Sequence, residues 1–133
     1  MNTIHSTSSA SAGSAMQKPR TRILIYTDDP ERGGVAQYNH SILLALAKEG
    51  YETHIVQSKS ESPLVMRQCE AGISHHWLPY DTASRFALTV TDMDTPKGVF
   101  QRVRPDLILF SDCCPVSNIA ARQTAIALRI PYI

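Results

Sequence analysis

Short apolar runs alternate with longer segments of helical periodicity along most of this chain. The first run, Ile23–Tyr26, is unbroken and rich in β-branched residues, which is typical of a strand buried on both faces of a parallel sheet. Gly50 marks the end of the helical segment that follows, and residues 53–56 begin a second strand. The apolar stripe of that helix is predicted to consist of Val35, Ile42, Leu43, Leu46 and Ala47.

The same alternation continues to the end of the chain and predicts the fold class. We expect further strands at 73–78, 107–110 and from 131 onward, with helices at 64–72, 96–103 and 119–128. Residues 86–90 alternate apolar with polar, as in a strand. Strands that alternate with helices indicate an α/β domain with a parallel sheet, helices on both faces and the strand order 3-2-1-4-5. In such a sheet, the crevice lies outside the carboxyl ends of strands one and four.

The first twenty residues differ from the rest in composition. Residues 1–20 are rich in Ser, Thr and Ala, contain no acidic residue and offer almost no large apolar side chain. Such a segment cannot bury enough surface to order itself, so a disordered tail is predicted. It lacks the apolar centre of a secretory signal, and Arg20 is its only arginine, which disfavours a transit peptide. The remaining residues, 21–133, are expected to form one domain.

Charge and cysteine content exclude several functional classes. Lys and Arg total 13 and Asp and Glu total 12, a net charge of +1, so no single-sign field indicates a nucleic-acid partner. No apolar run reaches the roughly 18 residues of a transmembrane helix, although peripheral membrane contact stays open. Three cysteines, Cys69, Cys113 and Cys114, give no complete disulfide framework and no metal-ligand spacing. We therefore expect reduced thiols, a cytoplasmic location and no bound metal.

A glycine pair, Gly33-Gly34, stands between the first strand and the first helix. The N-terminus of a helix presents unpaired N–H groups and a partial positive charge, so the pair could seat a phosphate. Two glycines can equally serve only to turn a strand into a helix. The loop has neither the third glycine of a dinucleotide fingerprint nor the Lys and Ser/Thr of a P-loop, and both interpretations stay open.

The order and spacing of several segments resemble the N-terminal domain of family-4 glycosyltransferases of the GT-B type. The matching segments are the first strand with its Gly-Gly-Val loop, the helix end and turn at 44–53, the Arg-Pro-Asp strand start at 104–109 and the segment 125–131. The resemblance implies a Rossmann-like domain that forms one half of a GT-B enzyme. It also implies a helix or an irregular loop at 86–90. Such enzymes transfer a sugar from a nucleotide-diphosphate sugar to a hydroxyl of a glycan, a lipid or a small molecule, without a metal or other cofactor.

The resemblance also implies roles for individual residues. Gly33 and Gly34 would approach the donor diphosphate through their backbone amides, a form of electrostatic catalysis. Asp112, Ser117 and Asn118 would line the acceptor pocket, although residues of these types also cap helices. The donor itself would bind to a second domain that lies beyond residue 133. The chain is thus expected to be a fragment that is inactive alone.

Two departures and two alternatives accompany this hypothesis. Many relatives carry a histidine after the fourth strand, but residues 110–114 contain none, and His40 is expected to be a packed or surface residue. The acidic pair Asp28-Asp29 also suits a phospho-receiver domain, although Asp81, the candidate for its phosphorylated residue, falls three residues past Leu78 and behind a proline. A non-catalytic α/β binding module is the simpler alternative.

Overall fold

The computed structural model describes residues 18–29 and 33–133, so most of the predicted tail lies outside the described residues. In chain order the elements are β1 (Arg22–Thr27), α1 (Gly34–Lys48), β2 (Glu52–Ser58), α2 (Pro63–Glu70), β3 (Ser74–Leu78), α3 (Phe86–Thr91), α4 (Asp94–Val103), β4 (Leu107–Ser111) and α5 (Ile119–Ala127). The expected alternation of strands and helices is confirmed.

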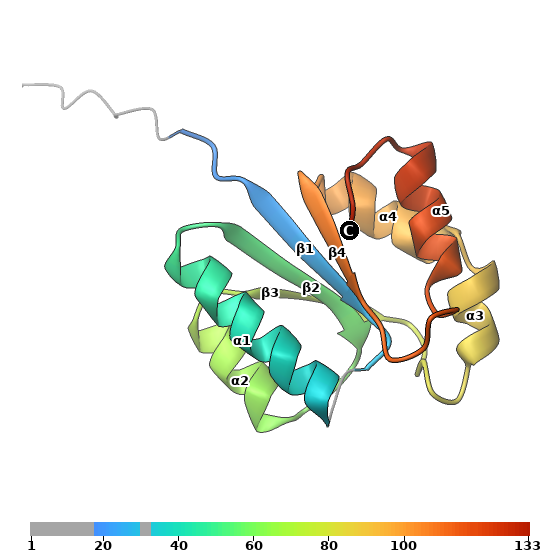
Figure 1. Ribbon diagram of the computed structural model, residues 1–133, viewed down its shortest axis with the longest axis horizontal. Coiled ribbons are helices and arrows are strands. Elements are labelled where there is room, and N and C mark those ends of the chain that lie inside the picture. The colour runs from blue at the N-terminus through green and yellow to red at the C-terminus, as the bar shows by residue number, and fades with distance from the viewer. Residues whose placement is uncertain (1–17, 30–32) are drawn as a thin grey trace, which may run out of the picture.

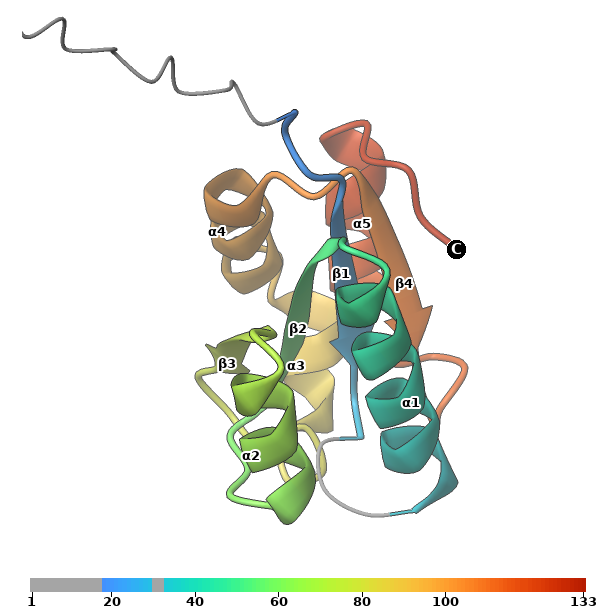
Figure 2. The same ribbon diagram turned by 90° about the vertical axis from the view of Figure 1, so that its left-hand side faces the viewer.

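The strands form one parallel sheet in the order β3-β2-β1-β4. Leu24 in the central strand β1 lies opposite His54 of β2 on one side and Ile108 of β4 on the other. Helices α1 and α2 cover one face of the sheet, and α3, α4 and α5 cover the other (Figures 1 and 2). The predicted Rossmann-like α/β class is therefore confirmed.

The strand order also decides against one alternative function. In a phospho-receiver domain the order is 2-1-3-4-5, which places the third strand beside the first. Here β3 pairs with β2, and the neighbours of β1 are β2 and β4. The phospho-receiver hypothesis, with Asp81 as its phosphorylated residue, is therefore wrong.

The sheet has four strands rather than the predicted five. The final residues do lie beside β4, where Ile108 donates its N–H to the carbonyl of Pro131 at 3.0 Å and Phe110 donates to Ile133 at 2.8 Å. They form an isolated parallel bridge between Ile108 and Tyr132 and not a strand. Three residues provide too few consecutive pairs for a ladder.

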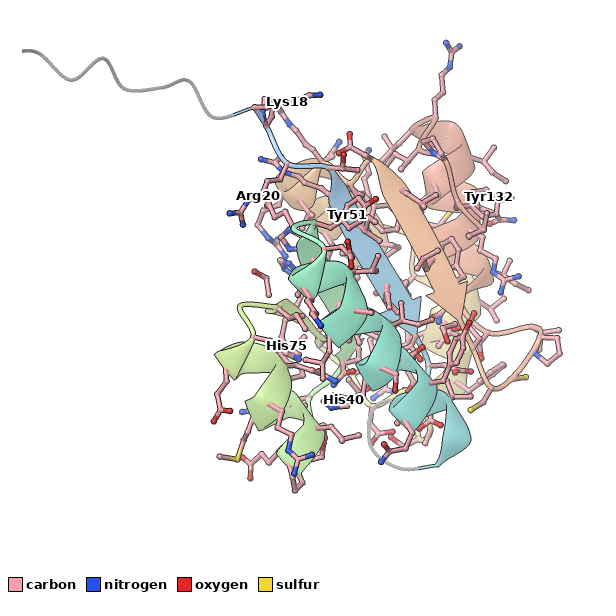
Figure 3. All side chains as sticks on the ribbon, turned by 60° about the vertical axis from the view of Figure 1, so that its left-hand side comes forward. Lys18, Arg20, His40, Tyr51, His75 and Tyr132 are labelled. Atoms are coloured by element: carbon pink, nitrogen blue, oxygen red, sulfur yellow. The ribbon has the colours of Figure 1, made fainter. Side chains whose placement is uncertain are left out.

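The predicted apolar stripe of helix α1 is confirmed in part. Leu43 is buried, and Ile42 and Ala47 are partly buried and pack against the same core, while Val35 and Leu46 are half-buried outside that cluster. The other buried residues of α1 are Ala36, Asn39 and His40, which the predicted stripe does not include. His40 is packed, as expected, since its Nδ1 lies 3.1 Å from Nε2 of Gln68 on α2 (Figure 3). Two polar side chains of α1 thus face inward, toward the layer between α1, α2 and the sheet.

Residues 86–91 form helix α3 and not the strand that their alternation predicts. Phe86 and Val90 are exposed, while the polar Thr89 is buried and donates its hydroxyl to the carbonyl of Phe86 at 2.7 Å. The alternating pattern misleads because apolar residues lie on the outer surface here. Helix α4 begins at Asp94, so Pro96 lies in its first turn, where a missing N–H is tolerated.

The hydrophobic core between the sheet and helices α3, α4 and α5 includes side chains of the central strand β1. Leu24 and Phe100 are 0% and 1% exposed, and the rings of Tyr26 and Phe100 meet edge to face with centroids 5.9 Å apart. Burial of these side chains in the central strand holds the sheet between its two helical layers.

Truncation of Leu24 tests the importance of this core. We expect Leu24→Ala to lower the free energy of unfolding by about 2–5 kcal/mol, because a fully buried side chain leaves a cavity. The matched control Ile126→Ala removes an aliphatic side chain that is 59% exposed on α5, and it should change stability by less than about 0.5 kcal/mol. Urea unfolding followed by circular dichroism measures both. Equal losses in the two variants would contradict this assignment of the core.

Candidate functional site

The loops that follow β1, β2, β3 and β4 gather at the carboxyl edge of the sheet. This is the edge at which open α/β sheets bind their ligands. Two regions of different character lie there. One is a hydrogen-bonded network between the β1 and β4 loops, and the other is a cleft between the N-terminal ends of α1 and α2.

The network is centred on the carboxylate of Asp28, directly after β1. The backbone N–H groups of Cys113 and Cys114 donate to its two oxygens at 2.7 and 3.2 Å, and the hydroxyl of Ser117 donates to it as well. The carbonyl oxygen of Asp28 accepts a hydrogen bond from the hydroxyl of Thr82 at 2.8 Å. One residue therefore connects the loops after β1, β3 and β4.

A second carboxylate, that of Asp112, holds the start of α5. It accepts a hydrogen bond from the Asn118 amide at 2.7 Å and pairs with the Arg122 guanidinium at 3.0 Å. Asn118 adopts a left-handed conformation before α5, at φ 57°. Burial raises the pKa of Asp112 to about 6, and the charge of Asp28 adds to this effect, while the bonds from Asn118 and Arg122 oppose it.

The thiol of Cys113 belongs to the same network. It donates a hydrogen bond to the Asp29 carboxylate at 3.1 Å, and this bond is the main reason why the pKa of Cys113 is raised to about 11. A thiol that keeps its proton is a poor nucleophile. Cys113 is therefore a hydrogen-bonding residue here and not an activated one.

The predicted acceptor residues all lie in this network. Ser117 is fully buried, Asn118 is 1% exposed, and the Asp112 side chain is 2% exposed. The structure brings them together, as expected for one loop, but their polar groups bond mainly to each other, to Asp28 and to Arg122. Contact between these three residues and an acceptor stays a prediction.

The glycine pair lies at the start of α1. Gly33 is the N-cap residue, with φ 107° and ψ −174°, a conformation that residues with a Cβ rarely adopt. Gly34 is the first helical residue and has open space where a Cβ would lie. Among the described residues no side chain caps α1, and its first turn has no acidic residue, so within this part of the chain its first N–H groups are available to an anion.

A cleft of about 560 Å³ lies between the N-terminal ends of α1 and α2. Its lining consists of Gly33, Gln37, Ser60, Glu61, Ser62, Pro63 and Leu64. Ser62 occupies the N-cap position of α2, and its side chain caps nothing. Two helix N-termini thus border one cleft, which places it at the carboxyl ends of β1 and β2.

Sequence reasoning missed the cleft residues that come from α1 and from the loop after β2. Gln37 lies within a helix, and residues 59–63 have the composition of an ordinary polar loop. A usable signal was present in Asn39 and His40, two polar residues on the inner face of α1, and in Gln57 at the end of a buried strand. Polar side chains in such positions indicate a polar cavity.

The described part of the chain contains neither a cluster of metal ligands nor a membrane-spanning helix. Across residues 18–29 and 33–133, no three His, Cys, Asp or Glu side chains come together as a metal site. None of the helices in these ranges combines the length and apolar character needed to cross a bilayer.

Comparison with known proteins gives structural neighbours only. No family model matches the chain, and no curated protein matches it. A glycosyltransferase from Rickettsia africae superposes with a TM-score of 0.60 at 12% identity, covering 86% of this chain and 29% of that one. The UDP-N-acetylmuramate:L-alanyl-gamma-D-glutamyl-meso-diaminopimelate ligase from Neisseria meningitides superposes with a TM-score of 0.57 at 15% identity, covering 86% and 28%. The chain thus shares a fold with less than a third of each neighbour.

Replacement of Asp28 tests the network. Asp28→Asn converts one accepting oxygen into an N–H donor and removes the charge, so at least one donor loses its acceptor. We expect a loss of about 2 kcal/mol or more in the free energy of unfolding. Asp94→Asn, in the exposed first turn of α4, is the matched control and should cost less than about 1 kcal/mol. Denaturant titration of both variants decides, and a neutral Asp28→Asn would refute the central position of this carboxylate.

The raised pKa of Asp112 predicts a pH dependence. The folded protein binds this proton more tightly than the unfolded chain, in which the pKa is about 4. The stability that the group contributes is therefore complete below about pH 4 and is lost as pH rises through about 6. As pH rises across this range, the free energy of unfolding of the wild type should fall relative to that of Asp112→Asn. A difference between the two that stays constant with pH, or that grows in favour of the wild type, would contradict the raised pKa of Asp112.

Proposed function

We propose that this chain is the acceptor-side, Rossmann-like domain of a GT-B glycosyltransferase related to family 4. The parent activity would transfer a sugar from a nucleotide-diphosphate sugar to an acceptor hydroxyl on a glycan, a lipid or a small molecule. The strand order, the glycine pair after β1 and the cleft at the carboxyl edge support this proposal. The three free cysteines agree with a reducing compartment such as the cytoplasm.

One observation carries the proposal: an uncapped helix N-terminus, entered through two glycines, opens onto a cleft. The N–H groups at the start of α1 have no side-chain partner among residues 18–29 and 33–133, and Gly34 lets a ligand approach the backbone. A helix N-terminus stabilises negative charge, and the leaving group of such a transfer is a nucleoside diphosphate. In the proposed reaction, the amides near Gly33 and Gly34 stabilise the charge that develops on this diphosphate.

The names of the structural neighbours add support. One is a glycosyltransferase, and the other is named for UDP-N-acetylmuramate, which is a nucleotide-linked sugar. Since the chain spans less than a third of either neighbour, we propose that a second domain supplies the rest of the donor site. Under this proposal, the 133 residues alone bind the donor weakly and transfer no sugar.

The polar network has a defined part in this proposal. Asp112, Ser117 and Asn118 would fix the β4–α5 loop, whose Cys113 bonds to Asp29 beside the cleft. Their contribution to acceptor binding would come through the position of this loop. No metal or other cofactor takes part in the proposed reaction.

A methyl group at Gly34 tests the diphosphate contact. We expect UDP to shift the backbone amide signals of Gly34, Val35 and Ala36 in an NMR titration of the labelled chain. Gly34→Ala should weaken this binding, because the methyl group occupies the path of the ligand. The higher helix propensity of alanine should at the same time raise the free energy of unfolding by up to about 1 kcal/mol.

Gly98→Ala is the matched control for Gly34→Ala. Gly98 lies in α4 and also has open space at its Cβ position, so alanine should raise stability without affecting UDP binding. UDP-induced shifts away from α1, or equal affinity of wild type and Gly34→Ala, would count against the proposed function. Transfer of sugar by the 133-residue chain alone would contradict the need for a second domain.

A further inference from the structure

Three polar side chains with buried, unpartnered atoms surround one small cavity. Both polar atoms of the Asn39 side chain, Nε2 of Gln57 and Oγ of Ser62 have no hydrogen-bond partner in the described structure. Asn39 and Gln57 are each only 3% exposed. An unsatisfied buried polar group costs about 1–3 kcal/mol, so three residues with such groups around one space need an explanation.

The cavity forms the inner end of the cleft. Its volume is about 10 Å³, and its walls come from α1, from β2 and from the start of α2. Ser62 and Leu64 line both the cavity and the cleft. A space of this size holds one water-sized group, such as a water molecule or a single hydroxyl of a larger ligand.

The charges of the walls distinguish between classes of ligand. The helix N-termini favour an anion, but the cleft also contains the carboxylate of Glu61, and that of Asp29 lines the inner cavity. Neither lining includes a lysine or an arginine among the described residues. Amides, serine hydroxyls and carboxylates together both donate to and accept from a hydroxyl group, which suits a neutral, polyhydroxylated ligand.

We propose that the cleft between α1 and α2 binds a sugar or a similar polyol, with one hydroxyl inserted between Asn39, Gln57 and Ser62. This inference rests on the proposed function, and it specifies the acceptor as a polyhydroxylated molecule whose binding site lies beside the diphosphate contact at Gly33. The inserted hydroxyl accepts from the Gln57 amide and donates to Oδ1 of Asn39. The outer hydroxyls of the ligand face Gln37, Ser60 and Glu61.

An NMR titration with methyl α-D-glucopyranoside tests the site in the absence of any nucleotide. The side-chain amide signals of Asn39 and Gln57 should shift in a saturable way, with an affinity on the order of millimolar, and backbone signals at Ser62 and Leu64 should follow. The matched probe 2-methoxytetrahydropyran has the ring without its ring hydroxyls and should leave these signals unchanged. Absence of saturable shifts with the glucoside would overturn the proposal.

Variants separate binding from folding. Asn39→Leu removes the unpartnered amide, so it should weaken glucoside binding at least about tenfold while the protein stays as stable as the wild type or becomes more stable. The control Gln123→Leu changes an exposed amide of α5, on the opposite face of the sheet, and should bind normally. Gln57→Met provides a second test if Asn39→Leu fails to fold. Unchanged binding in a folded variant of either residue would refute the site.

Three further outcomes can be told apart by these titrations. A long-lived water signal at Asn39 and Gln57 that the glucoside does not displace would identify a structural water site and overturn the polyol proposal. Glucoside binding without UDP shifts at α1 would support the polyol site while the proposed glycosyltransferase function fails. UDP shifts without glucoside binding would leave the function standing and remove this inference.

Discussion

The arrangement of the carboxyl edge depends on the carboxylate of Asp28. It fills the anion position that the backbone N–H groups of the β4–α5 loop create, with Cys113 and Cys114 as donors. A negative charge held by backbone amides gains charge-assisted hydrogen bonds that are roughly twice as strong as neutral ones. The loop therefore has its own internal anion, and this ties β1 to β4 at the point where the sheet meets the crevice.

The β4–α5 loop and the cleft between α1 and α2 differ in how their polar groups are bonded, although both lie at the carboxyl edge of the sheet. In the part of the chain that the structure describes, the first turn of α1 has no capping side chain and no acidic residue, and the hydroxyl of Ser62, the N-cap residue of α2, has no hydrogen-bond partner. Stability would be served by caps at both helices and by apolar residues at Asn39 and Gln57. Unpaired buried atoms also occur in the network, at Oδ1 of Asn118 and Nε of Arg122, but those of Asn39, Gln57 and Ser62 gather around one cavity. A group of unpaired polar atoms lowers stability, which is a property of binding sites. The open cleft and the closed network are thus complementary halves of one edge.

The sequence predicts the fold better than the site. The unbroken apolar run Ile23–Tyr26 and the glycine pair define β1 and the start of α1, since both reflect local backbone preferences. The predicted stripe of α1 includes Leu43 but omits the polar part of the buried face, because tertiary packing turns Asn39 and His40 inward, and no local rule places an amide in a core. Residues 86–91 became a helix because their apolar side chains lie on the surface, where alternation carries no information about burial.

The site resisted sequence analysis for a related reason. The sequence predicts that the loop after β4 receives a ligand, and this stays a prediction. Local pattern does not reveal that Ser117 and the backbone of Cys113 bond to Asp28, which lies 85 residues before Cys113. The cleft residues Gln37 and Ser60 come from separate elements, and only the pairing of β1 with β2 brings them together.

Hydrogen exchange of individual backbone amides, measured by NMR on the 133-residue chain, tests the central claim most directly. The claim is that the β4–α5 loop is closed by Asp28 while the start of α1 is open. It predicts slow exchange at Cys113 and Cys114 and fast exchange at Gly34 and Val35, although all four residues lie in or beside loops at the same edge. Fast exchange at the two cysteines together with protection at the start of α1 would contradict this account of the site.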